Sequence, residues 1–93
     1  MPQVSIIMPT YNRADTILRA IRSIQAQTCQ DWELIVVDDG SQDDTAALVA
    51  DVDPRLTLVW QTNQGVTAAR NTALGYCRGA YLAFLDSDDE WFP

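Results

Sequence analysis

Short apolar runs and amphipathic stretches alternate along this chain. Residues 4–8, VSIIM, form an apolar run rich in β-branched side chains, which is typical of a strand, and Pro9 ends it. Ile17, Ile21 and Ile24 then recur at helical spacing. The same alternation continues to the end of the sequence. It predicts strands near 4–8, 33–37, 56–61 and 80–86, and helices near 17–24, 41–52 and 65–77.

The order of these predicted elements, β-α-β-α-β-α-β, indicates an α/β fold. Strands that alternate with helices in this way are normally parallel, because a right-handed helical crossover joins each strand to the next. The second and fourth predicted strands are nearly all apolar, as in a sheet that helices cover on both faces. A chain of 93 residues can build one small domain. We therefore predict one Rossmann-like domain over residues 1–93, with a mostly parallel sheet flanked by helices.

Polar, aromatic and acidic residues follow the predicted strands. In open α/β sheets, ligands bind beyond the carboxyl ends of the strands. Taken singly, these residues have ordinary explanations as helix caps, turn formers or a solvated helical turn. Their convergence on one edge of the sheet favours a binding site instead. The four segments are 9–13 (PTYNR), 38–41 (DDGS), 62–65 (TNQG) and 86–90 (DSDDE).

Composition narrows the possible partners and chemistries. The net charge of −7, with six arginines and no lysine, argues against nucleic acid or an anionic membrane surface as a partner. The absence of histidine excludes Ser-His-Asp triads, Cys-His pairs and most zinc sites. Cys29 and Cys77 are expected to be free thiols. No signal peptide or membrane-spanning run is recognisable, so a cytoplasmic location is expected.

Asp86 and Asp88, spaced D-x-D after the last predicted strand, can converge on one hard cation. Mg²⁺ and Mn²⁺ prefer such oxygen ligands and often keep phosphate oxygens in their shell. A cation there would let an acidic cleft hold a diphosphate and would stabilise a departing diphosphate as a Lewis acid. Tyr11 can stack on a flat ring, and Asp39 can accept a hydrogen bond from a base N–H. These residues predict a metal-assisted nucleotide-diphosphate site.

Three other phosphate chemistries fit the sequence less well. A response-regulator receiver needs a lysine, and the chain has none. A haloacid-dehalogenase-type phosphatase normally carries its D-x-D-x-T motif after the first strand, whereas here the motif comes last and Glu90 occupies the threonine position. P-loop and dinucleotide-binding folds need G-x-x-x-x-G-K or G-x-G-x-x-G, and neither is present.

Four segments of the chain resemble, in order, the donor-binding half of family 2 glycosyltransferases, which have the GT-A fold: VSIIMPTYNR, DWELIVVDDGSQDDT, NQGVTAARNTAL and GAYLAFLDSDDEWFP. The resemblance covers nearly the whole chain at the usual spacing. It implies that Tyr11 lies against the base and that Asp39 reads the base edge, typically of uracil. The implied nucleotide-sugar contacts are Pro9, Thr10, Tyr11, Asp39, Arg70 and Asp86, and the implied metal ligands are Asp88 and Asp86.

The resemblance also implies a reaction, a cofactor and a missing part. Family members transfer a sugar from a nucleotide-diphosphate sugar to an acceptor hydroxyl, with Mg²⁺ or Mn²⁺ and usually with inversion; a UDP-sugar is the favoured donor. A general base must deprotonate the acceptor hydroxyl. In family members that base lies well beyond the D-x-D, so no catalytic residue is expected before Pro93. We expect a partial GT-A domain, truncated after the D-x-D loop, with little or no transferase activity alone.

Two further expectations follow from a partial domain. In place of a catalytic role, the chain could be a non-catalytic module that binds nucleotide or only contributes to an assembly. The missing part of the fold would leave a sheet edge and an apolar patch exposed, and exposed edges invite pairing between chains. Self-association through this edge is therefore expected.

Overall fold

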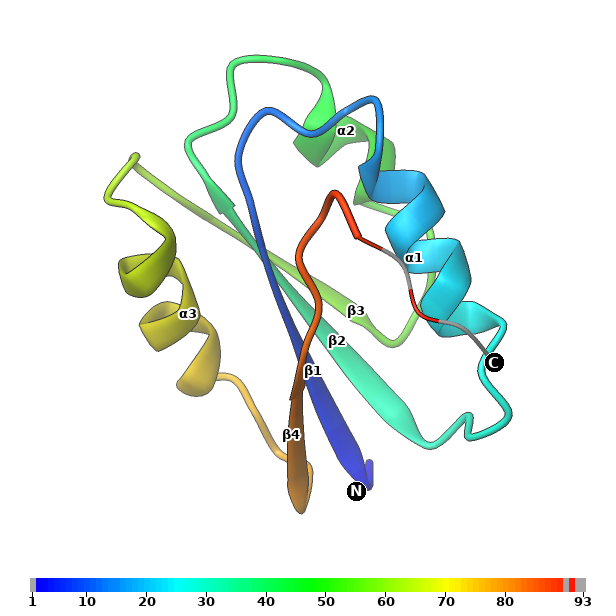
Figure 1. Ribbon diagram of the computed structural model, residues 1–93. Helices are drawn as coiled ribbons and strands as arrows, with labels where there is room; N and C mark the ends of the chain where they lie inside the picture. Colours follow the sequence, from blue (N-terminus) through cyan, green and yellow to red (C-terminus); the bar gives the residue numbers. More distant parts are fainter. Residues whose placement is uncertain (1, 90, 92–93) are drawn as a thin grey trace.

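The computed structural model describes residues 2–89 and 91, and within them the chain forms a four-stranded sheet and three helices (Figure 1). The element order confirms the predicted β-α-β-α-β-α-β alternation. None of the described helices has the length and apolar character that a bilayer crossing requires. The strands are β1 (Val4–Thr10), β2 (Trp32–Asp39), β3 (Leu56–Gln61) and β4 (Tyr81–Phe84), and the helices are α1 (Ile17–Gln25), α2 (Thr45–Val49) and α3 (Val66–Leu74).

The strands lie in the order β3-β2-β1-β4, and every neighbouring pair is parallel. The two central strands, β1 and β2, are buried along nearly their whole length, while β3 and β4 form the edges and are more exposed. The register places Thr10 opposite Asp38 near the ends of β1 and β2, and Ile7 opposite Phe84 where β4 ends. The carboxyl ends of these strands therefore meet at one edge of the sheet, as the sequence predicted.

Helices cover both faces of the sheet. In Figure 1, α1 and α2 lie on one side of it and α3 lies on the other. Alternate residues of β1 and β2 point to opposite faces, so each strand contributes to two apolar clusters. The helical spacing of Ile17, Ile21 and Ile24 turns one face of α1 into the larger cluster. That cluster also holds Ile6, Met8, Ala20, Trp32, Leu34, Val36, Val49 and Leu85; the smaller one, beside α3, holds Ile7, Ile35, Val37, Ala69 and Ala73.

A buried polar cluster at the amino ends of the strands fixes the approach of β4 to β1. Ser5 Oγ donates a hydrogen bond to Glu33 Oε2 (2.6 Å), and the backbone N–H of Arg78 donates to the same oxygen (2.6 Å). The backbone N–H of Gly79 donates to Ser5 Oγ (2.7 Å). Burial opposes ionisation of Glu33, but the hydrogen bonds from Ser5 and Arg78 outweigh it and lower the pKa of this carboxyl. The loop before β4 is thereby held against β1 and β2.

The two cysteines are free thiols, as expected. Cys29 is exposed, and Cys77 is partly buried near the Glu33 cluster, where burial raises the pKa of its thiol. The Cys77 thiol donates to the backbone oxygen of Ala73 (3.4 Å), in the last turn of α3. Both cysteines therefore belong to parts of the molecule away from the carboxyl edge of the sheet.

The β4 edge carries exposed apolar side chains. Tyr81, Leu82 and Phe84 have 63%, 49% and 52% of their surface exposed. Among the described residues, β4 has a single strand neighbour, β1. An open edge of this kind can pair with another chain. Self-association through β4 stays a prediction.

Gly79 is expected not to tolerate a side chain. A Cβ at this position would meet the backbone N of Ser5 at 2.6 Å and the backbone C of Val4 at 2.8 Å. Gly79→Ala should push β4 away from β1 and lower the free energy of unfolding by about 2 kcal/mol, as overpacking does elsewhere. Gly75→Ala is the matched control, because its Cβ would meet Thr72 O at an ordinary 3.5 Å. Urea denaturation measures both variants, and equal stabilities would contradict this account.

Candidate functional site

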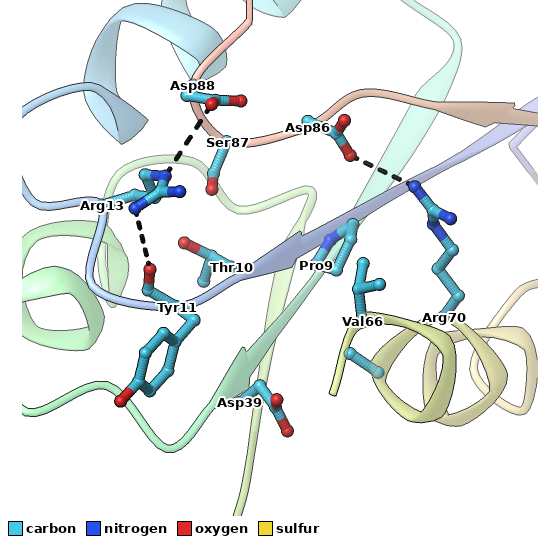
Figure 2. A pocket seen from close by; sticks show the side chains of 11 residues that line it. Pro9, Thr10, Tyr11, Arg13, Asp39, Val66, Arg70, Asp86, Ser87 and Asp88 are labelled. Atoms are coloured by element: carbon cyan, nitrogen blue, oxygen red, sulfur yellow. Dashed lines mark hydrogen bonds and ion pairs between the residues drawn. The ribbon is translucent and has the colours of Figure 1, made fainter. Parts of the chain in front are cut away.

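A pocket of about 360 Å³ opens at the carboxyl ends of β1, β2 and β4, beside the first turns of α3 (Figure 2). Tyr11 and Asp39 lie toward one end of the pocket, and Asp86 and Asp88 lie toward the other. The predicted edge of the sheet therefore does form a concave site. Its lining residues are Pro9, Thr10, Tyr11, Arg13, Asp39, Val66, Ala69, Arg70, Asp86, Ser87 and Asp88.

All the residues proposed from the sequence line this one pocket, although their roles toward a ligand stay predictions. Reasoning from the sequence missed four lining residues: Arg13, Val66, Ala69 and Ser87. Arg13 and Ser87 belong to the polar segments that follow β1 and β4. Their place in the sequence therefore already indicated that they lie at this edge of the sheet. Val66 and Ala69 belong to the first turns of α3, where helical periodicity does not reveal which side faces a ligand.

Asp39, the last residue of β2, joins this strand to the start of α3. Its Oδ1 accepts hydrogen bonds from Gln61 Nε2 (2.8 Å) and from the backbone N–H of Gln64 (2.9 Å), and its Oδ2 accepts from the backbone N–H of Gly65 (2.8 Å). Burial opposes ionisation of Asp39, but these bonds outweigh it and lower the pKa of the carboxyl. A carboxylate offers about four acceptor positions, so one remains for a donor in the pocket.

Hydrogen bonds between the loops after β1 and β2 keep Tyr11 at the mouth of the pocket. The backbone N–H of Asn12 donates to Ser41 Oγ (2.9 Å), and Asn12 Oδ1 accepts from the backbone N–H of Gln42 (2.8 Å). Asn12 has φ +51°, a left-handed conformation that asparagine adopts more readily than most residues. Asp38 Oδ1 accepts from the backbone N–H of Ser41 (2.8 Å), which closes the second loop into a turn.

The D-x-D segment forms a tight turn with exposed acids around a buried serine. The backbone N–H of Asp89 donates to Asp86 O (3.0 Å), and Thr16 Oγ1 donates to Ser87 O (2.9 Å), which ties the turn to the start of α1. Carboxylate oxygens of Asp86, Asp88 and Asp89 all lie within 4.8 Å of one another. One oxygen from each acid is therefore placed to reach a shared divalent cation. Reasoning from the sequence had left Asp89 out of the metal set.

Two arginines approach these acids from different walls of the pocket (Figure 2). Arg70, on α3, places Nη2 3.4 Å from Asp86 Oδ1. Arg13, in the loop after β1, places Nε 3.9 Å from Asp88 Oδ2. Ion pairs this exposed contribute about 1 kcal/mol or less to stability. The arginines nevertheless offset part of the negative charge that the acids bring to the pocket.

Two buried polar atoms of pocket-lining residues lack a hydrogen-bond partner within the part of the chain that the structure describes. They are Thr10 Oγ1 and Arg70 Nε. Buried polar groups in proteins are nearly always hydrogen-bonded, so each exception asks for an explanation. Both atoms belong to residues that line the pocket, and each can donate a hydrogen bond. The pocket thus combines an aromatic ring, a buried acid, unpaired donors and three acids whose oxygens lie within 4.8 Å of one another.

The sequence model of the family described as "Glycosyl transferase family 2" matches residues 5–93. The Escherichia coli UDP-Glc:alpha-D-GlcNAc-diphosphoundecaprenol beta-1,3-glucosyltransferase WfgD is 50% identical over an alignment of 92 positions that covers 95% of this chain and 36% of WfgD. The Bacillus subtilis putative teichuronic acid biosynthesis glycosyltransferase TuaG is 43% identical over an alignment of 94 positions that covers 97% of this chain and 37% of TuaG. The chain therefore spans little more than a third of the length of these relatives.

Solved structures show the same arrangement of strands and helices. Staphylococcus aureus TarS in complex with UDP-GlcNAc superposes with a TM-score of 0.89 at 34% identity, over 95% of this chain and 27% of the TarS chain. The mannosyltransferase PcManGT from Pyrobaculum calidifontis, in complex with GDP-Man and Mn²⁺, superposes with a TM-score of 0.88 at 37% identity. That likeness covers 97% of this chain and 28% of PcManGT.

Asp39 should stabilise the fold in a pH-dependent way. In Asp39→Asn, one carboxylate oxygen becomes an NH₂ group that cannot accept from its former donor, so the free energy of unfolding should fall by about 2 kcal/mol at neutral pH. A carboxyl with a lowered pKa stabilises the fold above its ordinary pKa of 3.8, and this contribution is lost as the pH falls through the lowered value. The gap between wild type and Asp39→Asn should therefore shrink below about pH 4.

Urea denaturation from neutral pH to below about pH 4 measures the difference in free energy of unfolding between wild type and Asp39→Asn. Asp51→Asn, at an exposed position between α2 and β3, is the control and should leave the unfolding midpoint at its wild-type value. A gap that stays constant down to acid pH, or no gap at neutral pH, would show that the Asp39 carboxylate does not hold the start of α3.

Proposed function

The chain belongs to glycosyl transferase family 2 and has the GT-A fold, and we propose that it forms a site for a nucleotide-diphosphate sugar and a divalent cation. The observation that carries this proposal is the convergence of Tyr11, Asp39, two arginines and the D-x-D acids on one pocket. A nucleoside needs an aromatic surface and a polar partner for the base edge. A diphosphate needs positive charge a short distance from the site of the base. The pocket offers both in one continuous hollow.

At the nucleoside end, Tyr11 would stack against the base and Asp39 would accept one hydrogen bond from a base N–H. The remaining acceptor position of Asp39 suits a base that presents a single N–H at this point, as uracil does. WfgD is named as a UDP-Glc glucosyltransferase, and TarS was solved in complex with UDP-GlcNAc; both support UDP as the nucleotide. PcManGT was solved with GDP-Man, so GDP is the alternative to be tested against UDP.

At the other end, the acids suit Mg²⁺ or Mn²⁺. Asp88 would be the main ligand, and Asp86 would lie toward the cation and toward the ribose or the donor sugar. Asp89 would be a third ligand, since its carboxylate lies in the same group. A bound cation would neutralise the diphosphate and act as a Lewis acid for its departure. The pairing of PcManGT with Mn²⁺ supports this choice of metal.

Sugar transfer to an acceptor hydroxyl, with inversion, is the reaction proposed for the enzyme that uses this site. That reaction needs a general base near the acceptor. The acids of the pocket are all assigned to the donor or to the cation, so none of them is proposed as the base. The alternative function is a non-catalytic module that binds nucleotide or contributes to an assembly. A chain that binds the donor but neither transfers nor hydrolyses the sugar would favour this alternative.

Calorimetric titration of UDP into the chain, with and without Mn²⁺, tests the proposal. Mn²⁺ should tighten UDP binding, and Asp88→Ala should remove at least about tenfold of that gain, since even groups around metal ligands are commonly worth that much. Tyr11→Ala should weaken UDP about tenfold with or without Mn²⁺, because it removes a stacking surface for the base. GDP should bind more weakly than UDP.

Asp51→Ala serves as the control for an exposed acid outside the pocket. It should leave both affinities unchanged. If no nucleoside diphosphate binds in a metal-dependent manner, the proposed donor site is wrong. If Asp88→Ala and Tyr11→Ala have the same effect in the presence and absence of Mn²⁺, the site exists but the two ends of the pocket have been assigned wrongly.

A further inference from the structure

The acids proposed to bind the cation already have positive partners. Asp86 Oδ1 lies 3.4 Å from Arg70 Nη2, and Asp88 Oδ2 lies 3.9 Å from Arg13 Nε. The two arginines belong to different elements, one to α3 and one to the loop after β1, and Figure 2 shows each of them directed at its own acid. All four residues line the same pocket. In this structure the guanidinium groups therefore stand near the position that a cation would share with the acids.

Both ion pairs are weak enough for a divalent cation to replace the arginine as the partner of the acid. The distances are longer than those of charge-assisted hydrogen bonds with good geometry, and neither arginine makes a two-pronged contact with its acid. Between 42% and 56% of each of the four side chains is exposed. Ion pairs with this much exposure contribute little to stability. A divalent cation approaches carboxylate oxygens to about 2.1 Å and carries twice the charge, so the arginines are poor competitors for it.

An arginine released from its acid would remain in the pocket with unmet hydrogen-bonding capacity. Arg70 Nε is already buried without a partner in the described part of the chain. Within the described residues, Arg13 Nη1 donates to two backbone oxygens, those of Tyr11 and Asn12, at 3.4 and 3.3 Å. Guanidinium groups keep their charge at every physiological pH. The Asp39 carboxylate accepts three hydrogen bonds from its neighbours, and the proposed function gives its last acceptor position to the base, so a diphosphate is the better partner for both arginines.

We propose that Arg13 and Arg70 are exchangeable counter-charges, which pair with Asp88 and Asp86 in the metal-free protein and with the diphosphate in the loaded protein. This inference rests on the proposed function, because it takes the nucleoside diphosphate and the cation as the ligands. The arginines then couple the two ligands. They oppose binding of the cation alone, and they favour binding of the cation and the nucleotide together.

The proposal predicts effects of opposite sign on the two ligands. Arg70→Gln and Arg13→Gln each remove a positive charge beside a proposed metal ligand, so each should tighten binding of Mn²⁺ alone by about threefold, the worth of an exposed ion pair. Each should weaken UDP, measured with saturating Mn²⁺, by about tenfold, because a charge-assisted bond to phosphate is lost. A residue that only contacted the nucleotide would leave the affinity for Mn²⁺ unchanged, and a structural residue would weaken both ligands.

The experiment measures Mn²⁺ alone, by loss of the free-ion signal in electron paramagnetic resonance, and UDP with Mn²⁺ by calorimetry. Arg70→Lys keeps the charge and should retain the wild-type affinity for Mn²⁺ while still weakening UDP. Arg22→Gln is the matched control, because Arg22 is exposed on α1 and does not line the pocket. It should change neither affinity.

The outcomes separate this inference from the proposed function. If the wild-type chain binds Mn²⁺ and UDP but neither glutamine variant binds Mn²⁺ more tightly, the exchange of arginines is wrong and the donor site stands. If the wild-type chain binds Mn²⁺ but no nucleoside diphosphate, the proposed function fails, and so does the diphosphate half of the exchange. If it binds Mn²⁺ neither alone nor in the presence of UDP, both proposals are overturned.

Discussion

The site depends on the parallel pairing of β1 with β2 on one side and with β4 on the other. Because the three strands run in the same direction, the segments that follow Thr10, Asp39 and Phe84 emerge together at one edge of the sheet. Each segment by itself contains residues that are common in turns and caps. The apolar clusters on both faces hold the strands in this register. The convergence of the segments, rather than any single residue, turns this edge into a pocket.

Asp39 shows how one residue serves both the fold and the site. Its bonds to the backbone of Gln64 and Gly65 bring the start of α3 to the end of β2. Arg70 lies one turn further along α3 and therefore faces Asp86 across the pocket. The carboxylate proposed to contact the base is also the group that positions the arginine proposed to contact the diphosphate. Substitutions at Asp39 will for this reason change stability and binding together, whereas Tyr11 and Asp88 can be changed at smaller structural cost.

The order of strands and helices and the convergence of the polar loops could be predicted from the sequence, because both follow from hydrophobic periodicity and from the geometry of parallel sheets. The ends of the elements were less predictable. β1 and β2 each extend two residues beyond the predicted strands, to Thr10 and Asp39, since backbone pairing continues past the apolar runs. The bonds of Asp39 to Gln64 and Gly65, and the closeness of Asp89 to the D-x-D acids, depend on loop conformations that periodicity does not encode.

The central claim is that one pocket holds the base at Tyr11 and Asp39 and the cation at Asp86 and Asp88. Backbone amide NMR of the chain, titrated first with UDP and Mg²⁺ and then with traces of Mn²⁺, tests it most directly. UDP is expected to shift the amides after β1, β2 and β4, and Mn²⁺ is expected to broaden signals most strongly around residues 86–89. Shifts centred on the opposite edge, around Glu33 and Gly79, or broadening unrelated to the D-x-D turn, would contradict it.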